Sequence, residues 1–286
     1  MHESGLIHTD EQNRYLIESR IGLSFPNVVP HGDIDTVLLG SCINVWAALV
    51  DDQIMEKHGH PGGELARAMG SLVELESISR TTDSDAPTPG LPGPLAELSQ
   101  RLHRIAAPEQ VLRAQWHLLQ YFMGLSTEAA HTHTTTTPTL ADYKRIRQLT
   151  TCMPLFFTLS EVCRGLHIPT RTLMRPEAQK LTASASDLIG ASNDIIGLRR
   201  DLRRGDTWTH VRLFVQQHEC TYQEAIDLLA AEFRSRVSEF ATLTDALQAA
   251  DPQYGPSYSD IIQDVIAGYM HWAQHSPRYT LDGWHH

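Results

Sequence analysis

Residues 43–56 read Ile-Asn-Val-Trp-Ala-Ala-Leu-Val-Asp-Asp-Gln-Ile-Met-Glu, a long apolar run that ends abruptly in acidic residues. Two adjacent carboxylates, Asp51 and Asp52, are costly to bury at the end of such a helix, because desolvating an unpaired charge takes several kcal/mol. Asp52 and Glu56 share a helix face, with Asp51 about 100° round the helix. The spacing predicts carboxylates that converge on one hard cation; an acidic helix end that surfaces into solvent is the alternative.

The same helical spacing of apolar residues continues through most of the 286-residue chain, whereas strand-like alternation is almost absent. The pattern predicts an all-α fold, and because no composition shift divides the chain we expect a single large helical bundle over residues 1–286. Stretches rich in Gly, Pro and Thr separate the expected helices. These helices are 34–57, 63–80, 94–105, 108–129, 139–165, 175–204, 221–250 and 257–274.

The charge balance limits the class of partner. Lys and Arg total 23 and Asp and Glu total 34, so the formal net charge is −11 and nucleic acid is not an expected partner. An acidic protein can still bind an anionic substrate if divalent cations bridge the two. The N-terminal stretch lacks a basic region followed by an apolar one, and no run of 18 or more apolar residues occurs. We therefore expect a cytoplasmic protein without stable membrane insertion. The cysteines lack Cys-x-x-Cys spacing and are expected to be reduced and structural.

A second polar motif lies at residues 193–201, which read Asn-Asp-Ile-Ile-Gly-Leu-Arg-Arg-Asp. Asn193, Gly197 and Asp201 follow one another in steps of four residues and form a narrow stripe on a helix. The first and last lie about 12 Å apart along the axis, too far for short side chains to bind one ion unless a middle ligand or a water helps. This motif alone is more typical of a polar stripe than of a site.

Together the two motifs resemble the class I terpene synthases, particularly the bacterial type, whose pattern is Asp-Asp-x-x-x-Glu followed by Asn-Asp-x-x-[Ser/Thr]-x-x-x-[Glu/Asp]. The resemblance covers about residues 42–279 and includes two more elements at the expected separations. Arg147 lies in a stretch similar to the family's arginine-bearing helix, 46 positions before Asn193 (193 − 147 = 46). Arg278 and Tyr279 resemble the family's C-terminal Arg-Tyr pair, with Arg278 85 positions after Asn193 (278 − 193 = 85).

The resemblance implies Mg²⁺-dependent ionisation and cyclisation of a linear isoprenoid diphosphate, with farnesyl diphosphate the expected substrate. The product would be a sesquiterpene hydrocarbon or alcohol, together with diphosphate. Three Mg²⁺ ions are implied, and the positions that would hold them are Asp51, Asp52, Glu56, Asn193, Gly197 and Asp201. The resemblance implies that the diphosphate is bound by Arg147, Arg200, Arg278 and Tyr279. It assigns the substrate pocket to Trp272, Phe156, Thr150 and Thr151.

The sequence departs from the family pattern at several positions. Gly197 stands where the family has a Ser or Thr ligand, and glycine offers no side-chain oxygen. Asp201 is one methylene shorter than the usual Glu. Ala47 and Ala48 are small where many relatives carry an aromatic residue, which could enlarge the cavity. The acidic motif begins early in the chain, so part of the N-terminal helical layer, residues 1–33, is expected to be shortened.

Several alternatives stay open at this point. The substrate could be geranylgeranyl diphosphate, and the protein could be a weak or inactive homologue that binds diphosphates. Prenyl chain elongation is a third possibility, although those enzymes carry a second Asp-rich motif where this chain has Asn193 and Asp194. Plain core packing is the alternative role for Phe156, Phe157 and Trp46. Family members often pair as dimers, and a homodimer is possible.

Overall fold

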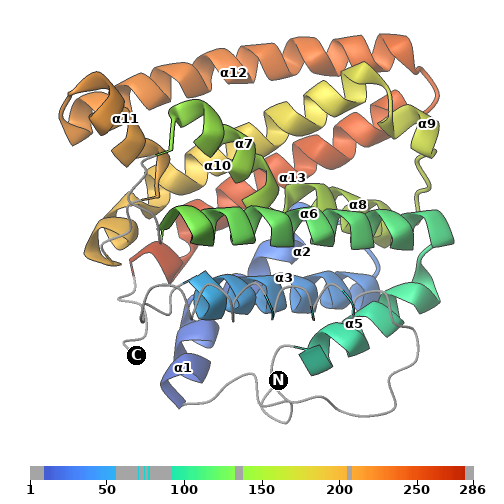
Figure 1. Ribbon diagram of the computed structural model, residues 1–286. Helices are drawn as coiled ribbons and strands as arrows, with labels where there is room; N and C mark the ends of the chain where they lie inside the picture. The colour runs from blue at the N-terminus through green and yellow to red at the C-terminus, as the bar shows by residue number, and fades with distance from the viewer. Residues whose placement is uncertain are drawn as a thin grey trace.

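The computed structural model describes residues 10–55, 92–132, 138–204 and 208–280, together with the single positions 70, 74 and 77. All regular structure within these ranges is helical, which confirms the predicted all-α fold (Figure 1). The elements in chain order are α1 (Asp10–Glu18), η1 (Ile21–Leu23), α2 (Ser24–Val28), α3 (Ile34–Met55), α5 (Pro92–Ile105), α6 (Pro108–Thr132), α7 (Leu140–Thr150), α8 (Met153–Cys163), α9 (Thr170–Leu173), α10 (Pro176–Arg204), α11 (His210–His218), α12 (Tyr222–Ala250), α13 (Gly255–His275) and η2 (Pro277–Tyr279).

The long helices pack as a bundle around α10 and α13. In Figure 1 α12 runs along one edge of the bundle, above α10, and α3 and α5 lie at the opposite edge. Helix α10 packs against α12, α13 and α7, and α13 also packs closely against α2. Helix α3 carries the acidic motif and α10 carries the asparagine motif. The bundle therefore places the two motifs on two sides of one interior.

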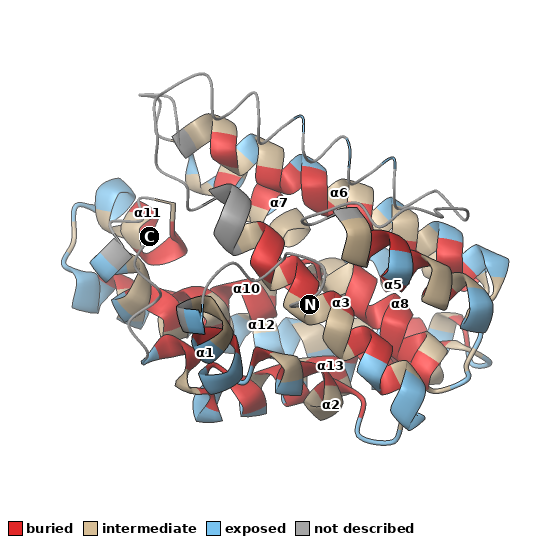
Figure 2. Cartoon of the chain, turned by 90° about the horizontal axis from the view of Figure 1, so that it is seen from below, coloured by how far each residue is buried: buried red, intermediate tan, exposed pale blue. Residues whose placement is uncertain are grey.

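Buried residues recur along these helices, as the red bands of the cartoon in Figure 2 show. The largest core cluster extends from α1 to η2 and includes Phe25, Trp46 and Phe157, each at most 2% exposed. Burying a large apolar side chain contributes about 1.5–3 kcal/mol to stability. A smaller cluster around Val211 and Leu229 holds α11 and α12 against the C-terminal half of α10.

The structure corrects the predicted helix over 139–165, which is two helices, α7 and α8. The chain turns at Cys152, whose φ of 57° is a left-handed conformation that interrupts the helix. Pro154 then lies in the first turn of α8, where its missing N–H costs no hydrogen bond. The predicted helix 63–80 lies almost wholly outside the described residues. The short elements α1, η1, α2, α9, α11 and η2 were not predicted.

Helix α3 is the most apolar of the long helices, and the stretch Ile34–Asp51 is long and apolar enough to cross a membrane by length and composition alone. In the fold this helix packs against α5, α8, η1 and α2. Trp46, Leu49 and Val50 are each at most 1% exposed. Burial inside the bundle therefore explains the apolar residues of its C-terminal half, whereas Ile34 and Leu38 near its start are exposed.

The N-terminal segment packs directly on α13. A Cβ atom at Gly268 of α13 would stand 2.2 Å from the backbone oxygen of Asn27 in α2, so only glycine permits this approach. Residues 10–28 thus form part of the wall around the interior. The expected shortening of the N-terminal layer stays a prediction.

Candidate active site

A cavity of about 190 Å³ lies in the bundle interior between α3, α7, α8, α10, α13 and the N-terminal η1 and α2. Ten of the predicted site residues line it: Asp51, Arg147, Thr150, Thr151, Phe156, Asn193, Arg200, Trp272, Arg278 and Tyr279. Residues more than 200 positions apart in the sequence are therefore gathered around one space, as their family resemblance implied.

Helix α3 presents one face to this cavity. Asn44, Ala47, Ala48 and Asp51 line it and follow the i, i+3, i+4, i+7 spacing of a single helix face. Asp51 is the acidic residue at the end of that face. The backbone of Asp52 lies in α3, but its side chain is outside the described structure, and Glu56 is outside the described residues. The predicted roles of those two residues stay predictions.

Arg147 of α7 is held against the asparagine motif of α10. Its Nη2 donates to Asn193 Oδ1 at 2.7 Å and to Asp194 Oδ1 at 2.8 Å. Tyr143, one turn earlier in α7, donates its hydroxyl proton to the other oxygen of Asp194. Burial alone would lower the pKa of Arg147, but Asp194 together with Tyr143, Glu128 and Tyr269 raises the pKa above its ordinary value. The guanidinium therefore stays charged.

The Nε of Arg147 is buried and has no hydrogen-bond partner among the described residues. An unsatisfied charged donor beside a cavity is costly unless an anion occupies the cavity. Gly190 of α10 makes room for this side chain, since a Cβ there would lie 3.1 Å from Arg147 Cγ. The arrangement suits an anionic ligand with several oxygen atoms.

Asn193 is fixed by groups from three other elements. In addition to its bond with Arg147, its Nδ2 donates to the Tyr269 hydroxyl at 2.9 Å and to the Tyr279 hydroxyl at 3.1 Å. Burial raises the pKa of Tyr269 well above its ordinary value, so the hydroxyl stays neutral. The amide of Asn193 is thereby held in one orientation at the cavity wall.

Gly197 and Asp201 do not belong to the residues that line the cavity. A Cβ at Gly197 would lie 3.3 Å from Asp201 Oδ2, so the Asp201 carboxylate folds back over the bare glycine. A carboxylate oxygen therefore lies beside position 197, one helical turn from Asn193. The roles of Gly197 and Asp201 at a metal site stay predictions.

The basic residues at this end of the cavity come from α7, α10 and η2. Arg200 lines the cavity, whereas Arg199 and Arg203 are exposed. Arg278 is 7% exposed and its Nη1 donates to the Tyr15 hydroxyl at 3.3 Å. Three guanidinium groups therefore face one cavity in a protein of net charge −11, which favours an anionic ligand at this point.

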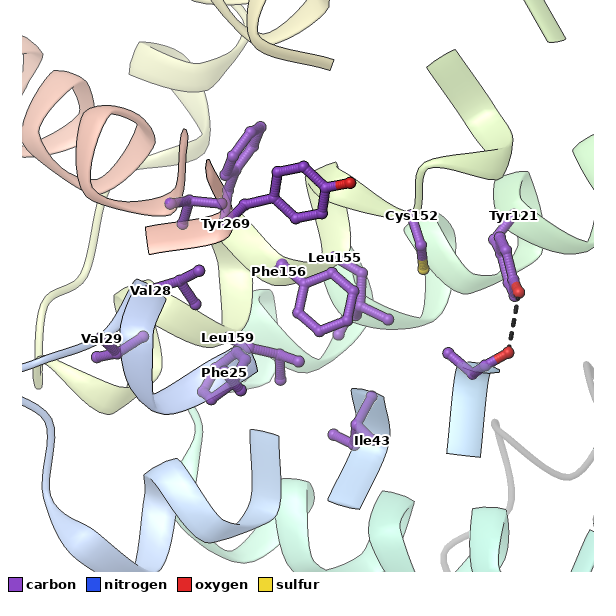
Figure 3. Packing of buried hydrophobic residues seen from close by; sticks show 14 of the residues in the cluster. Phe25, Val28, Val29, Ile43, Tyr121, Cys152, Leu155, Phe156, Leu159 and Tyr269 are labelled. Atoms are coloured by element: carbon purple, nitrogen blue, oxygen red, sulfur yellow. Dashed lines mark hydrogen bonds between the residues drawn. The ribbon is translucent and has the colours of Figure 1, made fainter. Parts of the chain in front are cut away.

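Aromatic and aliphatic side chains cover the rest of the cavity. Figure 3 shows Phe156 between Phe25 and Tyr269, and the Phe25 and Phe156 ring centroids lie 5.9 Å apart. Trp272 donates its Nε1 proton to the backbone oxygen of Arg20 at 3.0 Å, which fixes the ring. Two other aromatic residues, Trp46 and Phe157, pack in the core away from the cavity lining, as the alternative interpretation held.

The cysteines are free thiols, in agreement with the predicted reduced, structural role. Cys152 lines the cavity, and burial raises the pKa of its thiol above the ordinary value. The neutral thiol is a poor nucleophile. The cavity therefore lacks a thiolate at this wall.

The donor atoms around the charged end suit a hard divalent cation. Asp51 supplies carboxylate oxygen and Asn193 amide oxygen to the same cavity, and oxygen is the donor that Mg²⁺ prefers. Among the described residues no group of three His, Cys, Asp or Glu side chains forms a ready-made metal site. The oxygen donors present at Asp51 and Asn193 therefore fit a divalent cation such as Mg²⁺.

Several cavity residues were not predicted. Asn44 and Tyr269 lie on the same helix faces as the predicted Asp51 and Trp272, seven and three positions earlier, so helical spacing was a usable signal. The other unpredicted residues line the apolar wall of the cavity. They are Ile21, Phe25 and Val28, which lie in η1 and α2. No motif marks that segment.

Comparison with known proteins identifies what this site resembles. The family model described as terpene synthase family 2, C-terminal metal binding, matches residues 42–239. A (−)-alpha-amorphene synthase that cyclises (2E,6E)-farnesyl diphosphate, from Streptomyces viridochromogenes, is 24% identical over 252 residues, which cover 87% of this chain and 72% of that protein. A spiroviolene synthase from Streptomyces violens is 26% identical over 289 residues, covering 98% of this chain and 78% of that protein.

The fold is also shared with solved structures. An a-eudesmol synthase superposes with a TM-score of 0.83 at 18% identity and covers 96% of this chain and 90% of its own. A linalool/nerolidol synthase from Streptomyces clavuligerus superposes with a TM-score of 0.83 at 21% identity, covering 95% of this chain and 92% of its own.

Proposed function

Because the chain belongs to terpene synthase family 2, we propose that it uses Mg²⁺ to ionise farnesyl diphosphate and cyclise it to a sesquiterpene, with release of diphosphate. The chain is a terpene cyclase, a lyase that acts on an isoprenoid diphosphate. The choice of farnesyl diphosphate is supported by relatives that cyclise this substrate, among them a (−)-beta-caryophyllene synthase and a (+)-T-muurolol synthase.

The observation that carries the proposal is the division of one cavity into a charged end and an apolar end. Arg147, Arg200, Arg278, Asp51 and Asn193 bring charged and polar groups to the cavity lining, and Arg147 donates directly to Asn193. The other end is closed by aromatic and aliphatic side chains from α2, α8 and α13. An isoprenoid diphosphate has this same division between a polyanionic head and a hydrocarbon chain.

The charged end would bind and withdraw the leaving diphosphate. Arg147 and Arg278 are positioned by hydrogen bonds to Asp194 and Tyr15, so they can meet the diphosphate without reorganising. Asp51 and Asn193 would hold Mg²⁺, which supplies charge stabilisation to the departing diphosphate when bound.

The apolar end would fold the hydrocarbon chain and exclude bulk water from the cation. Trp272 and Phe156 present rings to the cavity, and a desolvated aromatic face stabilises a positive charge by up to about 2 kcal/mol. The Tyr269 and Tyr279 hydroxyls both accept hydrogen bonds from Asn193, and burial raises the pKa of Tyr269, so Tyr269 does not supply a phenolate to trap the cation.

The test is incubation of the purified chain with geranyl, farnesyl and geranylgeranyl diphosphates in the presence of Mg²⁺, followed by gas chromatography of an organic extract. We expect a fifteen-carbon hydrocarbon or alcohol from farnesyl diphosphate. A longer diphosphate would indicate prenyl elongation, and recovered substrate in all three reactions would indicate a silent homologue.

Geranylgeranyl diphosphate is the second candidate substrate. It is favoured by Ala47 and Ala48, which line the cavity and occupy little of it. The same incubation separates the two, because a twenty-carbon product would replace the fifteen-carbon one.

The cytoplasmic location and the homodimer stay predictions. Fractionation of the native host and light scattering of the purified chain test them independently of catalysis.

A further inference from the structure

An amide group lies on the cavity wall well away from the charged end. Asn44 is seven residues before Asp51 on the same face of α3, which places it about 10 Å further along the helix axis. Neither motif of the sequence includes Asn44, and the ionisation step does not use it. Its neighbours on the wall are Ile21, Ser24 and Phe25.

The hydrogen bonds of Asn44 fix the orientation of its amide. Its Nδ2 donates to the Ile21 backbone oxygen at 2.9 Å and to Ser24 Oγ at 2.5 Å, so both amide protons are used. The Ser24 hydroxyl donates its own proton to the same Ile21 oxygen at 2.9 Å. Turning the amide over would set its oxygen against a carbonyl oxygen, which is repulsive. The orientation with Oδ1 away from α2 is therefore the stable one.

Asn44 Oδ1 has no donor among the described residues, and Ser24 Oγ keeps a second lone pair after it accepts from Asn44. The residues that line this end of the cavity, such as Phe25, Val28 and Phe156, carry no donor in their side chains. Two acceptors on an otherwise apolar wall need a donor from outside the protein. A water molecule fits this need, because one water can donate to both oxygens.

We propose that Asn44 and Ser24 hold a water molecule at the apolar end of the cavity, so that the cyclised cation is captured as an alcohol rather than released as a hydrocarbon. A water that donates both protons to Asn44 Oδ1 and Ser24 Oγ presents its oxygen lone pairs to the cavity. Asn44 is a positioning residue in this reaction, since it acts through the water. The proposal rests on the proposed function and specifies its product class.

The capture step balances with water as the second reactant. A lone pair of the water oxygen forms a C–O bond to the cationic carbon, and the positive charge passes to the oxygen. The resulting oxonium loses one proton, which further water in the cavity relays to the diphosphate released earlier, the base at the charged end. The products are the neutral terpene alcohol and protonated diphosphate, and no oxidant or reductant is consumed.

The test compares the ratio of alcohol to hydrocarbon in the parent chain and in Asn44→Leu, with farnesyl diphosphate, Mg²⁺ and 18O-labelled water. Leu keeps the size of the side chain and removes its oxygen. We expect the parent to give a labelled alcohol as a main product and Asn44→Leu to lower the alcohol-to-hydrocarbon ratio at least about fivefold, as loss of a hydrogen bond to the water predicts. A ratio that is unchanged in Asn44→Leu, or a parent that gives hydrocarbon alone, would overturn the proposal.

Asn27→Leu is the matched control. Asn27 also sits in the N-terminal segment and its Nδ2 donates to a backbone oxygen, that of Leu23, at 2.6 Å, but it is not part of the cavity lining. This variant should keep the parental ratio. Ser24→Ala is the second test variant in case Asn44→Leu does not fold, and it should lower the ratio in the same direction.

The failure of this proposal can be separated from failure of the proposed function by following diphosphate in the same tubes. Diphosphate release with hydrocarbon products overturns the water site and leaves the cyclase function standing. Absence of diphosphate release by the folded parent from all three isoprenoid diphosphates overturns both.

Discussion

The two ends of the cavity are held in different ways. At the charged end, hydrogen bonds between helices fix each side chain: Arg147 to Asn193 and Asp194, and Asn193 to Tyr269 and Tyr279. At the apolar end, side chains are held in place by packing. The Phe25 ring, for example, lies so close to α3 that a Cβ atom at Gly40 would be only 2.1 Å from it.

This difference explains what each end tolerates. Hydrogen bonds are directional, so a small change of atom type at the charged end removes a specific function. Packing depends on volume and shape, so a change at the apolar end alters stability and product shape before it abolishes turnover. The predictions below test this contrast, in order of decreasing effect.

The largest effect is expected from Asp51→Ala, which removes the carboxylate that α3 presents to the cavity. Turnover should fall below detection while the circular dichroism spectrum stays that of the parent, because no core packing is lost. Asp35→Ala is the matched control, since Asp35 lies at the exposed start of the same helix. If Asp51→Ala kept the turnover of the parent, the metal site would have to lie elsewhere.

Arg147→Lys should lower kcat/KM at least about tenfold, which corresponds to about 1.4 kcal/mol. Lysine keeps the charge but cannot bond to Asn193 and Asp194 while it also offers a donor to the diphosphate. Arg145→Lys, on the same helix with an arginine side chain that is 74% exposed, is the control and should remain within twofold of the parent. A similar result for Arg147→Lys would show that Arg147 does not contact the diphosphate.

Phe25→Leu should change the distribution of products and lower the free energy of unfolding by about 1–2 kcal/mol. Phe157→Leu removes a ring that is equally buried but belongs to the core rather than to the cavity lining. It should lower stability by a similar amount and keep the parental product distribution. Equal product changes in both variants would show that packing alone, and not the cavity wall, controls the product.

Behind the charged end, His210 contacts the Tyr143 ring, with centroids 5.4 Å apart. Burial lowers the pKa of His210 to about 4, against the opposing effect of Asp194. Above pH 6.5 His210 is neutral in both states. Between pH 6.5 and 4 the unfolded chain binds a proton that the folded chain does not, so stability falls as the pH falls.

Urea denaturation at pH 7 and pH 5 measures this effect, and His210→Phe should lose less stability between the two pH values than the parent does. The same loss in both proteins would assign the acid sensitivity to other groups.

The smallest effect is expected from Gly197→Ser. The new side chain must displace the Asp201 carboxylate by a few tenths of an ångström, which a flexible side chain allows. If the serine oxygen joins the metal ligands, the Mg²⁺ concentration for half-maximal activity should fall. A gain in stability alone decides nothing, because replacing a helix-interior glycine is stabilising by roughly 0.5–1 kcal/mol in any case. An unchanged Mg²⁺ response would separate position 197 from the metal site.

The charged end could be predicted from sequence because its residues belong to ordered motifs with fixed helical spacing. Arg147 and Asn193 lie in helices, as expected, and line one cavity, whereas their roles stay predictions. The apolar end could not, because its walls come from short N-terminal helices whose stability depends on packing against α13 rather than on local propensity. Asn44 was overlooked inside a run that reads as apolar all round, and the turn at Cys152 was overlooked because a left-handed non-glycine residue leaves no signal in the apolar spacing.

The central claim is that one cavity ionises the substrate at its charged end and folds the hydrocarbon at its apolar end. The most direct test is the stoichiometry of the two products in a single reaction with farnesyl diphosphate and Mg²⁺. We predict one diphosphate released for each cyclic terpene extracted into pentane, and neither product when Mg²⁺ is chelated. Release of inorganic phosphate with acyclic farnesol, or diphosphate release that persists without a divalent cation, would contradict the claim.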